Sequence, residues 1–452
     1  MRKRTTVVAI ATVTAAAIVG GIFGVRRSGD AITPNAGTPN ASTPTAAVSA
    51  AAANGLARTS GASIEQTIAN LQAHLTTVPK DYPAWAALGL AYVQQAKVTV
   101  NSDFYPKAEG SFDNSLRIND VDNFLAYAGL SALASARHDF ALAEAHARKG
   151  LTFNPSSPVL YGALGDALVQ LGRYAEADDA IAKMASLRPD TSSYSRQSYL
   201  RELRGDIDGA RTLMQQALDV APTGSDRAFA LFYLGELDFN SGNVNGALDH
   251  YRRALAASPT DIQALAGKAK AEAALGQHLT AIDDYTAVVT RAPEPSVVLE
   301  FGTFLESIGR TAEARAQYQI VDATQRLFAA NGVEPDATMT LFDVDRGQPV
   351  AALASAERGI TTRPFLAMRD AYGWALHANG RDTEALAAVH QALELGTRSA
   401  ITHYHAGMIN LALGNNDAAR AELTTALTIN PFFDPLAAPA ARQTLLALGA
   451  SA

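Results

Sequence analysis

The chain of 452 residues contains no cysteine and few aromatic residues, 7% in all. The absence of cysteine excludes disulfide bonds, thiolate catalysis, cysteine ligands for zinc and a lipid-modified cysteine anchor, and it leaves the redox compartment open. Acidic residues outnumber basic ones, 44 to 37, so the formal net charge is −7. Such a chain offers no basic surface for a phosphate backbone, so nucleic acid is not an expected partner.

Catalytic motifs are missing as well. The sequence has no phosphate-binding glycine loop, no nucleophile elbow and no HExxH motif. His403 and His405 are two positions apart, which points them about 200° away from each other on a helix, so they cannot share a metal ion. We therefore expect a non-enzymatic protein with no catalytic residues, no metal site and no cofactor.

The first 27 residues form a separate segment. Residues 5–25 carry no charge and would span roughly 31 Å as a helix, close to the thickness of a bilayer core. Arg26 and Arg27 directly follow this run and favour an uncleaved membrane anchor, whereas its four threonines and three glycines leave a cleaved signal peptide open. The basic residues before the run slightly favour a cytoplasmic N-terminus. The rest of the chain is then expected outside the membrane, either anchored or secreted/periplasmic.

Residues 28–60 are rich in proline, alanine, threonine and asparagine and poor in large apolar side chains. A segment of this composition cannot bury a core, so it predicts a disordered linker.

A local pattern recurs through the remaining sequence. A glycine followed five positions later by alanine occurs eight times, at spacings of 33 to 38 residues. A small residue lies seven positions before each glycine, and proline lies seventeen positions after it in six of the eight cases. The marker glycines are Gly172, Gly205, Gly242, Gly276, Gly309, Gly347, Gly380 and Gly414. A fixed period of this length predicts an array of stacked repeats.

The columns of this pattern predict a hairpin of two helices in each unit. The marker glycine ends the first helix in the left-handed conformation, and the proline ends the second helix. The small residue and the repeat alanine let the two helices approach closely, while apolar residues at helical spacing fill the seam between them. One hairpin cannot cover its own apolar face, so neighbouring units must stack.

The resulting unit resembles the tetratricopeptide repeat (TPR), most closely in Tyr161, Leu164, Gly165, Gly172, Ala177, Ile181 and Pro189. The resemblance extends over residues 81–432, about ten units, and implies an all-α fold, a right-handed superhelical solenoid spanning 61–436. Residues 64–78 resemble a leading half-unit, and residues 437–452 a capping helix. Two departures stand out: a loop at 96–106 that is longer than usual, and a prolonged second helix around 318–331.

The resemblance also implies that the first helices line a concave groove for protein or peptide partners. Leu90, Val93, Leu130 and Leu133 are expected near its start. The positions carried over as the candidate groove are Asp166, Tyr199, Glu202, Phe232, Glu236, Phe239, Lys270, Trp374, His377, Tyr404 and Met408. This mixture of aromatic and acidic side chains suits a peptide with hydrophobic anchors and a basic residue. The alternative is that these side chains pack against neighbouring helices.

The basic clamp with which some TPR domains hold heat-shock chaperones is absent from these positions, which disfavours that partner class. The sequence therefore predicts a protein-interaction scaffold, tethered to or exported across a membrane. Two alternatives remain: an enzyme or a small-molecule- or metal-binding protein with a site near Trp374, His377 and Tyr404, and a homo-oligomer whose groove holds a second copy.

Overall fold

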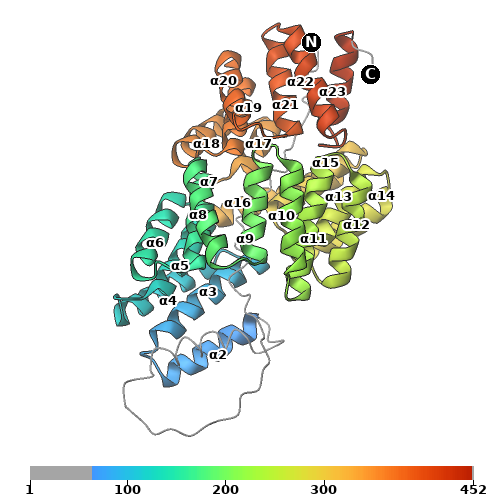
Figure 1. Ribbon diagram of the computed structural model, residues 1–452. Coiled ribbons are helices and arrows are strands. Elements are labelled where there is room, and N and C mark those ends of the chain that lie inside the picture. Colours follow the sequence, from blue (N-terminus) through green and yellow to red (C-terminus); the bar gives the residue numbers. More distant parts are fainter. Residues whose placement is uncertain (1–63, 450–452) are drawn as a thin grey trace, which may run out of the picture.

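The computed structural model describes residues 64–449, which form 22 helices and no strand (Figure 1). The predicted all-α superhelical repeat fold is confirmed. The array opens with a single helix, α2 (Ile64–Thr77), and closes with another, α23 (Ala437–Ala447). The predicted anchor at 5–25 and linker at 28–60 lie outside the described residues.

The helices between these two pair into ten hairpins. The first helices are α3 (Tyr82–Thr99), α5 (Phe124–Ala136), α7 (Pro158–Gln170), α9 (Thr191–Glu202), α11 (Gly224–Asn240), α13 (Ile262–Ala274), α15 (Pro295–Ser307), α17 (Ala337–Asp345), α19 (Leu366–Ala378) and α21 (Ala400–Ala412). The second helices are α4 (Phe104–Ile118), α6 (Phe140–Phe153), α8 (Tyr174–Leu187), α10 (Ile207–Asp219), α12 (Val244–Ala257), α14 (His278–Arg291), α16 (Thr311–Ala330), α18 (Pro349–Thr362), α20 (Asp382–Ala392) and α22 (Asn416–Ile429).

The small residues in the repeat hold each hairpin together as the sequence predicts. All eight marker glycines adopt positive φ angles, from 69° to 82°, and so end the first helix in the left-handed region. A Cβ atom at Gly302 would lie 2.5 Å from Cε1 of Tyr318, and one at Gly165 would lie 2.5 Å from Cγ1 of Ile181. The large side chain of the second helix thus occupies the space that a Cβ on the first helix would need.

The predicted long loop at 96–106 is wrong. Helix α3 continues through Ala96 and Lys97 to Thr99, and α4 begins at Phe104, so residues 100–103 alone connect them. Val100 ends α3 at φ 50°, a conformation that a β-branched residue rarely adopts, and its N–H bonds to the carbonyl of Ala96. The extra residues of this unit therefore lengthen a helix. The predicted prolongation of a second helix is observed, because α16 is 20 residues long.

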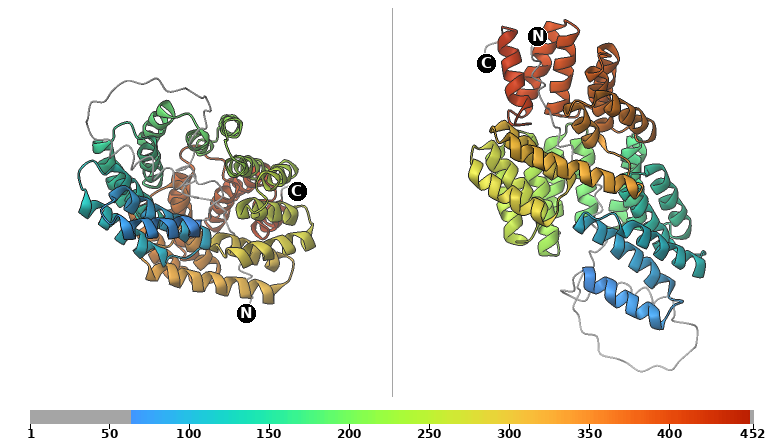
Figure 2. Two further views of the ribbon diagram at one scale, coloured as in Figure 1. Left: turned by 90° about the horizontal axis from the view of Figure 1, so that it is seen from below. Right: turned by 180° about the vertical axis from the view of Figure 1, so that it is seen from behind.

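The hairpins follow a superhelical path whose later turn rests on the earlier one. Figure 2 shows the hairpins from α3 to α16 arranged as a ring when the molecule is seen from below. His138, between α5 and α6, lies with Nδ1 2.7 Å from the carbonyl oxygen of Glu334, which precedes α17. Gly205, between α9 and α10, packs so closely on Gly396 that a Cβ would lie 2.3 Å from its carbonyl oxygen. These two contacts bring the later turn against the loops of the early units.

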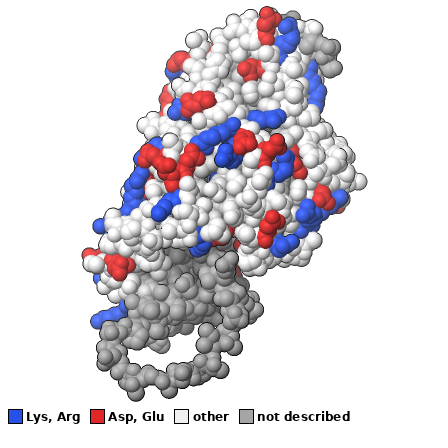
Figure 3. All heavy atoms as spheres, in the orientation of Figure 1, with Lys and Arg blue, Asp and Glu red and all other residues white. Residues whose placement is uncertain are grey.

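Basic and acidic side chains alternate in small groups on the face drawn in Figure 3. Among the half-exposed side chains, Arg173 forms ion pairs of 2.7 Å with Glu144 and 2.6 Å with Glu176. Within residues 64–449, no helix combines the length and the apolar character required to cross a bilayer.

Candidate functional site

Ionisable side chains from five consecutive first helices, α7 to α15, gather on the inside of the ring. We call them the inner-face cluster: Asp166, Arg196, Tyr199, Glu202, Tyr233, Glu236, Lys270 and Glu300. Most of them occupy one of two positions of the repeat, one residue after or two residues before the small residue at the helix crossing. These two positions are three residues apart and share one helix face, so stacking the units aligns the side chains.

Glu236 and Lys270 form the centre of the cluster. Nζ of Lys270 lies 2.8 Å from both carboxylate oxygens of Glu236, and the hydroxyl of Tyr251 donates to Glu236 at 2.5 Å. Nζ also lies 4.5 Å from the ring centroid of Phe239. Burial works against the charged form of Lys270, but Glu236 and Glu300 outweigh it and raise its pKa. Lys270 therefore keeps its charge beside the Glu236 carboxyl group.

Asp166 and Arg196 form a second closed pair. Nε and Nη2 of Arg196 donate to the two carboxylate oxygens of Asp166 at 2.8 and 2.7 Å. Nη1 donates to the carbonyl oxygen of Ser192 at 3.1 Å. Burial raises the pKa of Asp166, and Arg196 opposes that shift. A bidentate pair of this kind fixes both side chains and leaves little charge for a ligand.

Glu202 is one of two carboxyl groups of the cluster, with Glu300, that form no ion pair within residues 64–449. No ion pair of Glu202 occurs within residues 64–449, and its hydrogen-bond partner is the side chain of Asn240. Burial, followed by the neighbouring charge of Glu236, raises the pKa of Glu202 to about 7. Burial also raises the pKa values of Tyr199 and Tyr233, whose hydroxyls lie within the field of Glu202. An acidic group flanked by two phenol rings therefore faces the inside of the ring.

Glu300 adds a further carboxylate. It accepts a hydrogen bond of 2.5 Å from the hydroxyl of Tyr285, and burial raises its pKa. The cluster thus holds four carboxyl groups against the two cations Arg196 and Lys270. This excess of acidic groups makes the inner face attractive to a positively charged ligand.

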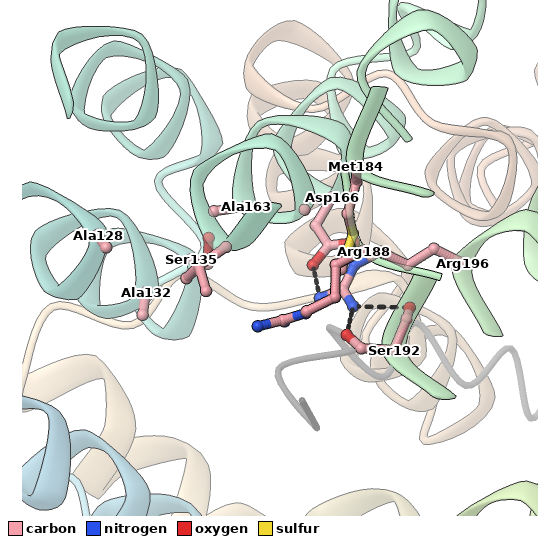
Figure 4. Close-up of a pocket in the computed structure, with 11 residues that line it drawn as sticks. Ala128, Ala132, Ser135, Ala163, Asp166, Met184, Arg188, Ser192 and Arg196 are labelled. Carbon is pink, nitrogen blue, oxygen red and sulfur yellow. Dashed lines mark hydrogen bonds and ion pairs between the residues drawn. The ribbon is translucent and has the colours of Figure 1, made fainter. Parts of the chain in front are cut away.

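A small pocket adjoins the cluster on its α5 side (Figure 4). Its walls come from α5, α7, α8 and α9 and consist mainly of small side chains, with two arginines at the rim. The lining residues are Ala128, Ala132, Ser135, Val159, Gly162, Ala163, Asp166, Met184, Arg188, Ser192 and Arg196. The cavity measures about 40 Å³.

The candidate groove residues fall into two groups. Phe232, Phe239, Trp374 and Tyr404 are 6%, 4%, 7% and 1% exposed and pack within the array. Glu236 and Lys270 are also buried but form the polar centre described above. The side chains with accessible surface are Asp166, Tyr199, Glu202, His377 and Met408. Contact between these residues and a ligand stays a prediction. Among these accessible side chains, Glu202 is the carboxyl group without an ion pair within the described residues.

The corner around Trp374 is a stack of rings. His405 lies 4.2 Å from the Trp374 ring on one side and His377 lies 4.9 Å away, both nearly parallel to it. Nδ1 of His377 is 2.5 Å from Asp382, and Nδ1 of His405 is 2.9 Å from Asp370. The histidines therefore pair with different carboxylates. In the part of the chain from 64 to 449, no three metal-ligating side chains come together.

Sequence reasoning missed Arg196, Tyr233 and Glu300. All three lie two positions before the small residue of their unit, so the repeat itself carried the signal that would have found them. Arg188 was missed for a different reason. It lies in the loop between α8 and α9, where the repeat predicts only the following proline.

Known proteins were compared with the chain as a whole. Two sequence models, both described as tetratricopeptide repeat, match it, one at residues 201–262 and 371–432 and the other at 159–191. No curated protein matches the chain. Several solved structures are similar to the chain. One is a tetratricopeptide repeat protein from Parabacteroides merdae, which shares 16% sequence identity with this chain and has a TM-score of 0.33. The similarity covers 57% of this chain and 98% of the Parabacteroides merdae protein.

Two further solved structures are similar. The pilF protein of Pseudomonas aeruginosa shares 16% identity over 47% of this chain and 92% of its own, with a TM-score of 0.35. The human IFIT1 dimer with PPP-AAAA shares 17% identity over 70% of this chain and 73% of its own, with a TM-score of 0.43. The family matches and the helical hairpins agree on one conclusion: the chain carries tetratricopeptide repeats within an all-α superhelical array.

Proposed function

We propose that this protein is a protein-interaction scaffold whose inner face binds a peptide segment through a basic side chain. The observation that carries the proposal is the carboxylate of Glu202, which no cation neutralises and which lies beside Tyr199 and Tyr233. Tetratricopeptide repeats are surfaces for protein partners, and the role requires no reaction.

Three features favour a lysine or arginine side chain as the group bound. The other two strong ion pairs, Glu236 with Lys270 and Asp166 with Arg196, are already closed. A cation at Glu202 would reduce the excess of acidic groups in the cluster and relieve a carboxylate held partly out of water. The phenol rings of Tyr199 and Tyr233 would cover the aliphatic part of the side chain and add cation–π attraction.

A display library of random peptides tests the proposal. Selection on the full-length protein is expected to enrich lysine or arginine at one fixed position, and the Glu202→Gln variant is expected to lose that enrichment. Asp249→Asn, on helix α12 with an exposed carboxylate, is the matched control and should retain it. Equal enrichment by wild type and Glu202→Gln would remove the basic-side-chain proposal. Light scattering of the selected complexes shows whether a second copy of the chain occupies the site instead.

We further propose that residues 5–25 tether the array to a membrane, with the repeats on the extracytoplasmic side. The charge-free run of bilayer length between basic residues supports this. Carbonate extraction of membranes from cells that express the full chain should leave the protein in the pellet, and removal of residues 1–27 should release it. The mass of the mature N-terminus separates an anchor from a cleaved signal peptide.

A further inference from the structure

The two lengthened helices of the array meet at one junction. Helix α3, of 18 residues, and helix α16, of 20 residues, are the longest first and second helices among those described. Nδ2 of Asn331, directly after α16, donates to Oγ of Ser102 at 3.0 Å and to Oδ1 of Asp103 at 3.3 Å. The short connection between α3 and α4 therefore holds the end of α16, although Ser102 and Asn331 lie 229 positions apart in the sequence.

Residues 327–334, which we call the clasp segment, also contact the second hairpin. Nδ1 of His138, between α5 and α6, donates to the carbonyl oxygen of Glu334 at 2.7 Å. Val333 is 8% exposed and belongs to the apolar cluster built on α2 to α5, and Phe328 packs against that cluster. Polar and apolar contacts of the clasp segment thus join the end of α16 to the first two hairpins.

The turn that receives Glu334 departs from the repeat. His138 lies seven positions after Ser131 and five before Ala143, which is the place where later units carry the marker glycine. It nevertheless adopts φ 62°, in the left-handed region that glycine tolerates and other residues avoid. A strained residue of this kind points to a role for its side chain. At this turn the side chain binds the clasp segment, which a glycine could not do.

The clasp segment closes the wall of the ring (Figure 2). From α3 to α16 each helix packs against the next one in sequence, so the wall is continuous between these two helices. The clasp segment joins the last of them to the first. A partner segment that binds at Glu202 inside this wall has to enter through an end of the ring, because closely packed helices leave no passage between them.

We propose that the clasp segment keeps the ring shut and that the inner face accordingly takes a linear partner segment with a free chain end. The inference rests on the proposed function for the basic side chain at Glu202 and adds the class of partner. An unfolded terminus can be threaded into a closed ring. A loop held at both ends by a folded domain cannot, so such loops are excluded.

Cross-linking tests the closed state of the clasp. The chain lacks cysteine, so the full-length double variant Ser102→Cys/Asn331→Cys contains one reactive pair. A short bismaleimide is expected to join this pair within one chain. Ser102→Cys/Asp417→Cys is the control, because Asp417 is exposed on α22 at the other end of the molecule, and it should stay unlinked (Figure 1). A Ser102/Asn331 pair that is linked no better than the control overturns the clasp.

A peptide with one or two blocked ends tests the class of partner. The probe is a lysine peptide from the display selection, extended on both sides by flexible glycine–serine arms. One form carries a folded protein on one arm, and the other form carries it on both arms. Biolayer interferometry measures the association of each form with the wild type, the cross-linked variant and an opened variant, His138→Gly/Asn331→Ala. This last variant removes clasp contacts and restores the glycine of the repeat, and circular dichroism confirms that it is folded.

The form with one free end is expected to bind all three proteins. The form blocked at both ends should associate with the wild type about tenfold or more slowly, since the clasp must open first, and should not bind the cross-linked variant. The opened variant should bind both forms at similar rates. Equal association of the two forms with the wild type or with the cross-linked variant overturns the requirement for a free end, while the basic-side-chain site stands. Failure of both forms to bind any of the proteins overturns the proposed function and the class of partner together, and the cross-linking result still decides the clasp.

Discussion

The backbone N–H of Leu366 donates a hydrogen bond to the hydroxyl of Tyr174 at 2.9 Å, although the two residues lie 192 positions apart in the sequence. Tyr174 opens helix α8 and is 8% exposed, and Leu366 opens helix α19. The contact belongs to a seam between successive turns of the superhelix, together with His138 at Glu334 and Gly205 at Gly396. The seam fixes the pitch of the array and so the width of the ring that contains the inner-face cluster.

Tyr174→Phe should lower the free energy of unfolding by about 1–3 kcal/mol, because it leaves the buried N–H of Leu366 without an acceptor. Urea denaturation followed by circular dichroism measures the change. Tyr161→Phe, in the same repeat but with no hydroxyl partner within the described residues, should have a far smaller effect. Equal losses in the two variants would show that the hydroxyl of Tyr174 does not hold the seam.

Comparison of Gly205→Ala with Gly276→Ala distinguishes the cost of disrupting the seam contact from the cost of the left-handed backbone conformation. Both glycines have left-handed φ angles, 72° and 75°, so each alanine costs about 1–2 kcal/mol for the conformation alone. Gly276 has nothing within 4 Å of the added Cβ, whereas Gly205 meets the carbonyl oxygen of Gly396 at 2.3 Å. Gly205→Ala should therefore be the more destabilising variant, and in small-angle scattering it should show a longer particle because the seam has opened. Identical unfolding midpoints would contradict the seam contact.

Gly302→Ala should destabilise the array by about 1–3 kcal/mol, since its methyl group would overlap the ring of Tyr318. Gly110→Ala is the matched comparison within a helix. That glycine lies in α4 with open space around it, so alanine should stabilise the protein by up to about 1 kcal/mol through helix propensity. Thermal unfolding of the two variants should shift in opposite directions. A neutral Gly302→Ala would contradict the close crossing of α15 and α16.

The sequence predicts the hairpins well because their determinants are local. A marker glycine, a small residue at the crossing and a large side chain such as Tyr318 lie within one unit, so a single period contains both members of each contact. The loop at 96–106 was misjudged because the repeat length suggested an insertion between helices, whereas Ala96, Lys97 and Val98 readily continue α3.

The seam could not be predicted, because it joins residues almost six repeats apart and depends on the pitch accumulated over all the units between them. A trace of it is nevertheless present. Two positions after the marker glycine, the units that contact Leu366 and Gly396 carry Tyr174 and Ile207, whereas later units carry polar residues such as Thr311 and Asp382. An apolar residue at this position is needed where another turn covers it.

The candidate site was predictable in the same way, up to a limit. Residues next to the small position, such as Asp166 and Tyr199, follow from the repeat alone. Which carboxylate remains without a cation does not, because the pairing of Glu236 with Lys270 depends on how two successive units are rotated against each other. Arg188 could not be found, since no column of the repeat includes the loop that holds it.

Glu202 should make the stability of the protein depend on pH. Its pKa is about 7 in the folded chain, against about 4.3 for an ordinary glutamate. A raised pKa means that the folded state holds the proton more tightly, so the contribution of this group to stability is full below about pH 4.3 and is lost as the pH rises through about 7. Glu202→Gln, which cannot ionise, should therefore raise the urea midpoint relative to wild type at about pH 8, and the difference should shrink toward about pH 5.

Glu384→Gln is the control, because an ion pair with Arg381 lowers the pKa of that exposed carboxyl and the expected change is small and of opposite sign. A Glu202→Gln effect that is the same at both pH values would mean that the carboxylate is fully solvated, and the charge available for a basic ligand would then be no different from that of any surface glutamate.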